Sequence, residues 1–132
     1  MRAVLDSDVW LAILTTDRFC RRMWRTARRT CQFAVSQDIL SEVERKLLGK
    51  FGFLPRHARL LTLFVARQAE LTHVVSTMDV CRDPDDNRVL AAAFDAGCSH
   101  VVTGDSDLLV LKRVRTVSVV TPREFLALIP AD

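Results

Sequence analysis

The sequence predicts an α/β fold in which a mostly parallel, five-stranded sheet is flanked by helices to form a three-layer sandwich. Short apolar runs alternate with longer amphipathic segments, and helix-start signals follow several of the runs, an order that favours parallel strands joined by helices. The 132 residues are 49% hydrophobic and 27% charged, which suits one compact core. We therefore expect residues 1–132 to form a single domain.

The expected strands are short apolar runs that end at polar residues. The first run ends at Asp6, and the fourth leads into Thr103, Gly104 and Asp105. The five strands are expected at residues 3–5, 32–35, 72–76, 100–102 and 117–120.

The expected helices begin and end at residues that favour helix termini. Ser36 is suited to an N-cap, Pro55 to a first turn, and Gly49 and Gly97 to positions just after a helix. The residues from Thr121 to Glu124 form a capping-box pattern. Helices are expected at residues 9–14, 18–29, 37–48, 55–69 and 83–96, with a last one from residue 122 onward.

Composition argues against a membrane protein and against a zinc site. No apolar stretch approaches the roughly 20 residues that a membrane helix needs, and the N-terminus reaches a charge at Asp6 too early for a signal peptide. We therefore expect a cytoplasmic protein. The four cysteines form no CxxC pair, which predicts reduced and mostly buried thiols. They are Cys20, Cys31, Cys81 and Cys98.

Six arginines gather in one segment that carries no acidic residue. They are Arg18, Arg21, Arg22, Arg25, Arg28 and Arg29. Such a patch is suited to bind phosphate groups. It is equally well explained as the solvated face of an amphipathic helix, and the sequence leaves both interpretations open.

Four acidic residues fall where a parallel sheet would bring them together. Asp6 and Asp105 follow strands, Asp86 lies in the first turn of a helix, and Glu42 lies in the helix after the second strand. Ligands of such sheets bind at the carboxyl ends of the strands. Converging carboxylates repel one another unless a cation shares the site, and oxygen ligands of this kind suit Mg²⁺ or Mn²⁺ rather than zinc.

Each of these acids also has a structural explanation. Asp83 and Asp86 could act only as helix caps. Glu42 and Glu44 border the same apolar stripe on opposite sides, so helical geometry does not choose between them.

Several segments, in order along the chain, resemble the motifs of the PIN-domain family. The first is Val4-Leu5-Asp6-Ser7-Asp8-Val9-Trp10, the second runs from Ser36 to Val43, and the third is Asp83-Pro84-Asp85-Asp86-Asn87. The fourth and most specific is Val102-Thr103-Gly104-Asp105-Ser106-Asp107, and the stretch from Thr121 to Leu126 is similar to the family's usual ending. The closest resemblance is to small prokaryotic VapC-like toxins of toxin–antitoxin pairs.

This resemblance implies an endoribonuclease that depends on Mg²⁺ or Mn²⁺. It implies an RNA substrate, a cognate antitoxin partner and a homodimer. The catalytic and metal-binding residues it implies are Asp6, Glu42, Asp86 and Asp105, with Asp8, Ser36, Thr103 and Asp107 in support. Arg21, Arg22, Arg25, Arg28 and Arg29 are then candidates to bind the RNA backbone, with Arg88 and Lys112 as further options.

One departure from the family pattern is Asp8, because the family usually has asparagine at this position. The extra charge could supply another metal ligand, tighten metal binding or form a salt bridge elsewhere, and the sequence does not choose among these.

Two other functions are compatible with the sequence. Asp6-Ser7-Asp8 and Gly104-Asp105-Ser106-Asp107 also resemble motifs of haloacid-dehalogenase-like phosphatases, in which Asp6 would attack phosphorus directly. That class also needs a lysine, and Lys46 and Lys50 are expected on an exposed helix face. The other alternative is a PIN fold without catalysis that binds RNA or a protein.

Overall fold

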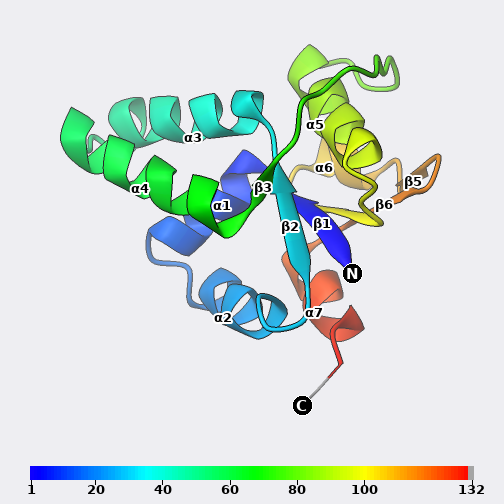
Figure 1. Ribbon diagram of the computed structural model, residues 1–132, viewed down its shortest axis with the longest axis horizontal. Coiled ribbons are helices and arrows are strands. Elements are labelled where there is room, and N and C mark those ends of the chain that lie inside the picture. Colours follow the sequence, from blue (N-terminus) through cyan, green and yellow to red (C-terminus); the bar gives the residue numbers. More distant parts are fainter. Residues whose placement is uncertain (131–132) are drawn as a thin grey trace.

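A six-stranded, mostly parallel sheet forms the centre of the fold, as seen in the computed structural model, which describes residues 1–130 (Figure 1). The strands are β1 (Arg2–Leu5), β2 (Gln32–Val35), β3 (Glu70–Leu71), β4 (His100–Val102), β5 (Arg113–Val114) and β6 (Val117–Val120). Their order across the sheet is β3-β2-β1-β4-β6-β5. All neighbouring pairs are parallel except β5 and β6.

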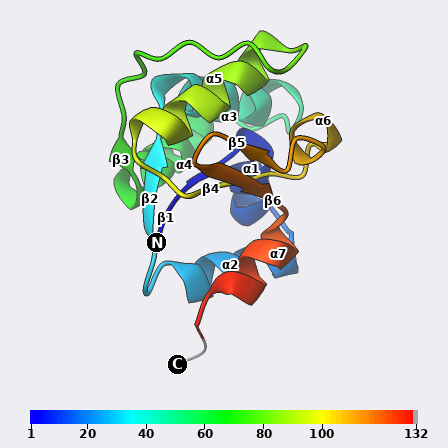
Figure 2. The same ribbon diagram turned by 90° about the vertical axis from the view of Figure 1, so that its right-hand side faces the viewer.

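Helices cover both faces of the sheet, which confirms the predicted sandwich of three layers. They are α1 (Ser7–Leu14), α2 (Arg18–Ala27), α3 (Gln37–Gly49), α4 (Pro55–Gln68), α5 (Pro84–Asp95), α6 (Ser106–Leu109) and α7 (Pro122–Leu128). In Figure 1, α1, α3 and α4 lie on one side of β1 and β2, and α5 lies on the other. The view turned by 90° shows α5 crossing in front of the central strands (Figure 2).

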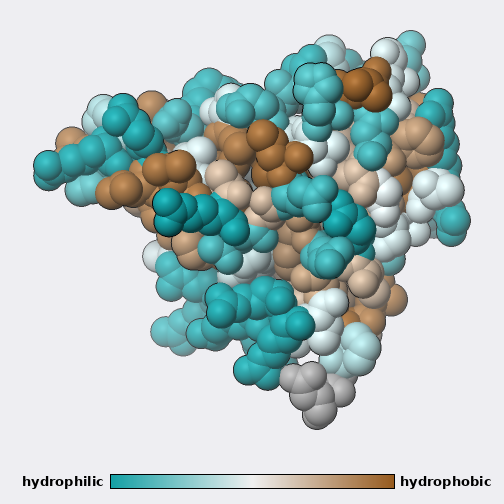
Figure 3. Space-filling view, in the orientation of Figure 1, coloured by the Kyte–Doolittle hydropathy of each residue, from teal (hydrophilic) through white to brown (hydrophobic). Residues whose placement is uncertain are grey.

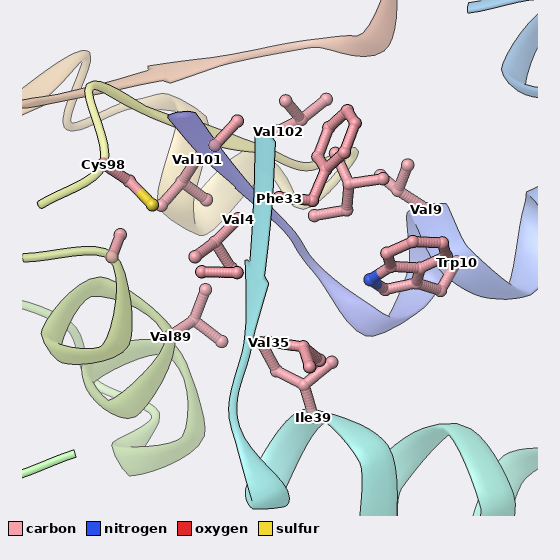
Figure 4. Close-up of a cluster of buried hydrophobic side chains, with 14 of the residues drawn as sticks. Val4, Val9, Trp10, Phe33, Val35, Ile39, Val89, Cys98, Val101 and Val102 are labelled. Carbon is pink, nitrogen blue, oxygen red and sulfur yellow. The ribbon is translucent and has the colours of Figure 1, made fainter. Parts of the chain in front are cut away.

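The core fills the space between the sheet and both helical layers. Side chains of a strand alternate between its two faces, so Val4 and Val101 point toward α5 while Phe33 and Val102 point toward α1 (Figure 4). The indole of Trp10 is fully buried. This packing fixes the strands, and thereby fixes the loops that follow their carboxyl ends.

The expected third strand at residues 72–76 is wrong in position, since β3 is a two-residue strand at Glu70–Leu71. After it the chain leaves the sheet and contacts α5 instead. The carboxylate of Asp95 accepts hydrogen bonds from the backbone N–H groups of Val75 (2.7 Å) and Ser76 (2.8 Å). Those N–H groups are therefore satisfied without a strand partner.

The structure also contains two elements that the sequence did not predict. One is the short helix α6, and the other is β5, which pairs with β6 in antiparallel fashion. The turn between β5 and β6 contains Arg115 in the left-handed region with φ 54°, where glycine or asparagine is the usual signal.

Two expectations from composition can be compared with the described residues. Cys20, Cys31 and Cys98 are buried, Cys81 is partly buried, and each is a free thiol. No helix within residues 1–130 is both long enough and apolar enough to cross a membrane.

Candidate active site

A cavity of about 320 Å³ at the carboxyl edge of the sheet gathers carboxylates from four separate parts of the chain. We call it the acidic pocket. It is lined by Asp6, Ser7, Asp8, Glu42, Lys46, Asp83, Asp85, Asp86, Val89 and Asp105. All four acids expected to be catalytic therefore face one space, as does Asp8.

Asp6 is the most firmly held of these acids. It directly follows β1 and caps α1, where its Oδ1 accepts the backbone N–H of Ser7 at 2.7 Å. Its Oδ2 accepts the hydroxyl of Thr103 at 2.9 Å. Burial, and then the charge of Asp8, raise the pKa of Asp6 to about 7. The pocket thus contains a buried carboxylate that lacks a neutralising partner.

Asp8 connects the first helix to the loop after β4. Its Oδ2 accepts the backbone N–H of Gly104 at 3.1 Å, and a Cβ atom at Gly104 would lie 3.0 Å from that oxygen. A side chain at Gly104 would therefore crowd this contact, and the Asp8 carboxylate would have to shift to accommodate it. The other oxygen of Asp8 is buried without a hydrogen-bond partner among the described residues. Burial raises the pKa of Asp8.

Thr103 joins the first and last acids of the pocket. Its hydroxyl donates to Asp6 and accepts the backbone N–H of Asp105 at 3.0 Å. Asp105 caps α6, and its Oδ1 accepts the backbone N–H of Asp107 at 2.9 Å. The side chain of Asp107 is exposed and does not line the pocket. The contact of Asp107 with the site is therefore made by its backbone.

Helix α3 supplies Glu42 and also a cation. The ammonium of Lys46, one turn later, lies 2.8 Å from Oε1 of Glu42. Burial acts to raise the pKa of Glu42, but the hydrogen bond and the charge of Lys46 outweigh it and hold the pKa below its ordinary value. Lys46 lines the acidic pocket, whereas it was expected on an exposed face, and Glu44 does not line the pocket. Ser36 caps α3 by accepting the N–H of Ile39 at 3.2 Å.

The three competing aspartates at the start of α5 differ in burial and in pairing. Asp83 is the N-cap and accepts the N–H of Asp85, which itself pairs with Arg88. Asp86 is 7% exposed, and burial followed by the charge of Asp105 raises its pKa to about 6. Asp86 is thus the buried and least compensated acid of this helix start.

Asn87 has a positioning role that its place in the sequence does not by itself reveal. Its Oδ1 accepts the backbone N–H groups of Val80 (2.9 Å) and Cys81 (2.8 Å), and its Nδ2 donates to the carbonyl of Cys81 at 3.0 Å. These bonds fix the loop that leads into α5. The sequence feature that could have indicated this role is a polar residue next to Asp86, on the buried side of an alanine-rich helix.

The expected RNA-binding arginines lie away from the acidic pocket. Figure 1 places α2 at the opposite end of the strands from α3 and α5, and none of the arginines between residues 18 and 29 lines the pocket. Arg21 has a structural role, since its guanidinium donates to the carbonyls of Ile13 (2.9 Å) and Thr15. Two other arginines, Arg45 and Arg88, line an adjoining cavity of about 270 Å³ that shares Glu42 with the acidic pocket.

The donor atoms of the acidic pocket fit a hard divalent cation such as Mg²⁺ or Mn²⁺ in their chemistry. The unpaired oxygen of Asp8 and the raised pKa values of Asp6 and Asp86 indicate carboxylates without sufficient neutralising charge. As they stand, no three His, Cys, Asp or Glu side chains among residues 1–130 are grouped closely enough to hold one ion. Side chains would have to move for an ion to bind, Glu42 in particular because it is paired with Lys46.

The fold and the pocket define a small α/β protein whose candidate site is built from carboxylates. Residues 2–107 match the PIN domain family, and the chain belongs to that family. The predicted family resemblance is therefore confirmed. None of the curated proteins compared with the sequence matches it.

Solved structures with a similar fold include three Vap proteins. VapBC2 from Rickettsia felis, solved bound to a DNA fragment from its promoter, has a TM-score of 0.69 at 9% identity, over 92% of this chain and 98% of that chain. VapC20 from Mycobacterium tuberculosis, a Sarcin-Ricin loop cleaving toxin, has a TM-score of 0.66 at 16% identity, over 88% of this chain and 98% of that chain. VapBC-1 from nontypeable Haemophilus influenzae has a TM-score of 0.65 at 9% identity, over 93% of this chain and 99% of that chain. At these identities the similarity shows a shared fold.

Proposed function

We propose that this protein is a metal-dependent endoribonuclease that hydrolyses RNA phosphodiester bonds and acts as the toxin of a toxin–antitoxin pair. The observation that supports it most is the acidic pocket itself, in which Asp6, Glu42, Asp86 and Asp105 face one space within a PIN-family fold. The similarity in fold to VapC20, described as a Sarcin-Ricin loop cleaving toxin, supports a role as a cleaving toxin.

In this proposal Asp6 and Asp105 hold Mg²⁺ or Mn²⁺, and Glu42 and Asp86 complete the site directly or through water. When bound, the ion would activate water and neutralise charge that develops on the phosphodiester. The hydroxyl of Thr103 holds Asp6 next to the backbone of Asp105, and Asp8 fixes the loop at Gly104. Hydrolysis then leaves a 5′-phosphate and a 3′-hydroxyl.

The phosphatase alternative is less well supported by the surroundings of Asp6. A nucleophilic aspartate must be accessible to the phosphorus of a phosphomonoester. Both oxygens of Asp6 accept hydrogen bonds, from Ser7 and from Thr103, and the side chain is 8% exposed. Membership of the PIN family also favours the nuclease.

RNA would enter beside the acidic pocket, where the adjoining cavity carries Arg45 and Arg88. The guanidinium of Arg45 is suited to hold a phosphate beside the cut, and Arg88 could do so on release from Asp38 and Asp85. The arginines of α2 lie too far from the pocket for this role and would contact a longer RNA or another protein.

A protein partner is supported by the similar VapBC structures and by exposed apolar side chains on α4. Leu54 at the start of this helix is 54% exposed, Leu60 is 63% exposed and Leu63 is 48% exposed. Figure 3 shows apolar patches over this helix. We propose that a cognate antitoxin covers this surface and that the protein forms a homodimer, which light scattering with and without the antitoxin would measure.

The test of the proposed function is cleavage of a mixed pool of structured and single-stranded RNAs. Wild type, Asp6→Asn and Asp105→Asn are each assayed with Mg²⁺, Mn²⁺ or EDTA, and Glu44→Gln is the control because Glu44 lies on α3 outside the acidic pocket. We expect cutting that needs metal, that both pocket substitutions abolish and that the control retains. RNA binding without cutting by the folded, metal-loaded wild type would favour a non-catalytic binding protein instead.

A further inference from the structure

The acidic pocket is lined by one cation, Lys46, among the residues that the structure describes. We propose that the Lys46 ammonium is an internal counter-ion that occupies the pocket in the metal-free protein and competes with the divalent cation for Glu42, so that it sets the metal affinity. This inference rests on the proposed function and assigns a positioning residue to that same site.

The contact between Lys46 and Glu42 differs from an ordinary surface ion pair. A glutamate followed four residues later by lysine is a common stabilising pair on exposed helices. Here the two side chains are only 24% and 31% exposed, for Glu42 and Lys46 respectively, and their charged atoms lie 2.8 Å apart. Because both face the acidic pocket, the pair occupies a Glu42 oxygen that the proposed site needs.

The surplus of negative charge around Lys46 explains why a cation belongs there. Asp6, Asp8 and Glu42 line the pocket beside it. Asp8, at the usual asparagine position of the family, adds a carboxylate that makes no salt bridge among the described residues. The ammonium charge of Lys46 acts on Asp8 against the effect of burial. Lys46 therefore offsets charge that a bound ion would otherwise neutralise.

A second cavity gives the displaced ammonium a place to go. Lys46 and Asp8 also line a neighbouring space of about 350 Å³, on the side of α1 and the end of α3. This space is lined by Asp17, Thr15 and Thr16, and also by the exposed Lys50. When a divalent cation takes Glu42, the flexible lysine side chain can turn into this space, and its positive charge moves away from the ion.

The competition follows from charge alone. A carboxylate oxygen that already accepts an ammonium hydrogen bond is a weaker ligand for a divalent cation, and like charges a few ångströms apart repel strongly in a half-buried site. Removal of the ammonium therefore tightens metal binding, even though it leaves the metal-free pocket less stable.

The experiment measures the Kd for Mn²⁺ by calorimetry and by the electron spin resonance of free Mn²⁺. Lys46→Met removes the charge and keeps most of the apolar stem. Lys50→Met is the matched control, since Lys50 is the C-cap of α3, one turn after Lys46, is exposed, and lines the neighbouring cavity but not the acidic pocket. Lys46→Arg keeps the charge, and Glu42→Gln with and without Lys46→Met tests whether the competition acts at Glu42.

We expect Lys46→Met to tighten Mn²⁺ binding by at least about threefold, with Lys46→Arg and Lys50→Met close to wild type. In the Glu42→Gln background the effect of Lys46→Met falls below about twofold, because coupled residues are not additive. A wild-type Kd in Lys46→Met, weaker binding, or equal tightening in Lys50→Met would overturn the inference and leave the proposed nuclease intact. Failure of both wild type and Lys46→Met to bind Mn²⁺ or cut RNA would instead refute the proposed function, and this inference with it.

Discussion

The acidic pocket and the arginine-rich helix α2 carry opposite charge and are built in different ways. The pocket collects acids that are far apart in sequence, from Asp6 to Asp105, around the carboxyl ends of parallel strands. The arginines of α2 are neighbours in sequence and are exposed, and Figure 3 shows a hydrophilic surface over this helix. The pocket buries Asp6 and Asp86 and raises their pKa values, whereas the arginines of α2 are exposed.

This difference shows what charge clustering in a sequence can indicate. Arginines spaced along an amphipathic helix face solvent because their apolar neighbours Met23, Trp24 and Ala27 are buried. Acidic residues that follow neighbouring parallel strands instead form a concave site, because the loops after these strands meet at one edge of the sheet. The convergence of scattered acids is therefore stronger evidence of chemistry than a local run of one charge.

The largest expected difference between the two regions is in catalysis. Asp105→Asn should lower RNA cleavage by about a hundredfold or more, because it removes a proposed ligand of the metal. The double substitution of Arg22 and Arg25 by glutamine should change cleavage of a short RNA by less than about threefold. Initial rates with Mn²⁺ measure both. Equal losses would show that α2 takes part in the site after all.

A large effect on stability is expected at Thr103, whose hydroxyl connects Asp6 to the backbone of Asp105. Thr103→Val should lower the free energy of unfolding by about 1–3 kcal/mol, since it leaves buried polar groups without partners. Thr103→Ser keeps the hydroxyl and should lose less. Urea unfolding in EDTA measures both variants, and a smaller loss in Thr103→Val than in Thr103→Ser would mean that packing of the methyl group, rather than the hydrogen bonds, is what matters.

The raised pKa values predict an unusual pH dependence of stability in the absence of metal. Between about pH 4 and pH 7 the folded protein keeps protons on Asp6 and Asp86 that the unfolded chain has released. Folding stability from these groups is present at low pH and is lost as pH rises through about 6 and 7. Glu42, whose pKa is lowered, acts in the opposite direction at lower pH.

The substitution Asp6→Asn tests this pH dependence of stability, because asparagine cannot ionise. It should raise the free energy of unfolding in EDTA at pH 7.5 by on the order of 1–3 kcal/mol relative to wild type, and the difference should vanish near pH 4. Thermal unfolding across this range measures it. A variant that is less stable than wild type at every pH would show that the hydrogen bonds of Asp6 outweigh its charge.

The smallest expected effect concerns RNA binding by α2. Substitution of Arg22 and Arg25 by glutamine should leave the affinity for a short RNA, and its dependence on salt, close to wild type, because the acidic pocket lies at the other end of the strands. Arg45→Gln, beside the pocket, should weaken binding. A flatter salt dependence in the α2 variant would indicate direct phosphate contacts there.

Much of the fold could be predicted because its signals are local. Ser36, Asp83 and Thr121 are N-caps as expected, and Gly97 follows α5 with a φ of 67°. The third strand could not be placed, since Asp95, distant in sequence, holds the backbone of residues 75 and 76 away from the sheet. The turn at Arg115 carries no residue that marks a hairpin.

The residues that line the acidic pocket were easier to predict than the contacts that they make with one another. Strand ends identified Asp6 and Asp105, and the family pattern selected Asp86. Helical spacing could not choose Glu42 over Glu44, nor show that Lys46 faces the same space, because the rotation of α3 is set by its packing on α1 and α4. The hydrogen bond between Asp8 and Gly104 joins residues far apart in sequence, so no local pattern reveals it.

The central claim is that the acidic pocket is a cation site, and calorimetric titration with Mn²⁺ tests it most directly. Wild type should bind Mn²⁺ saturably, Asp6→Asn should lose this binding while it keeps its fold, and Glu44→Gln should bind as wild type does. A wild-type protein that binds no Mn²⁺, or an Asp6→Asn variant that binds it unchanged, would contradict the claim.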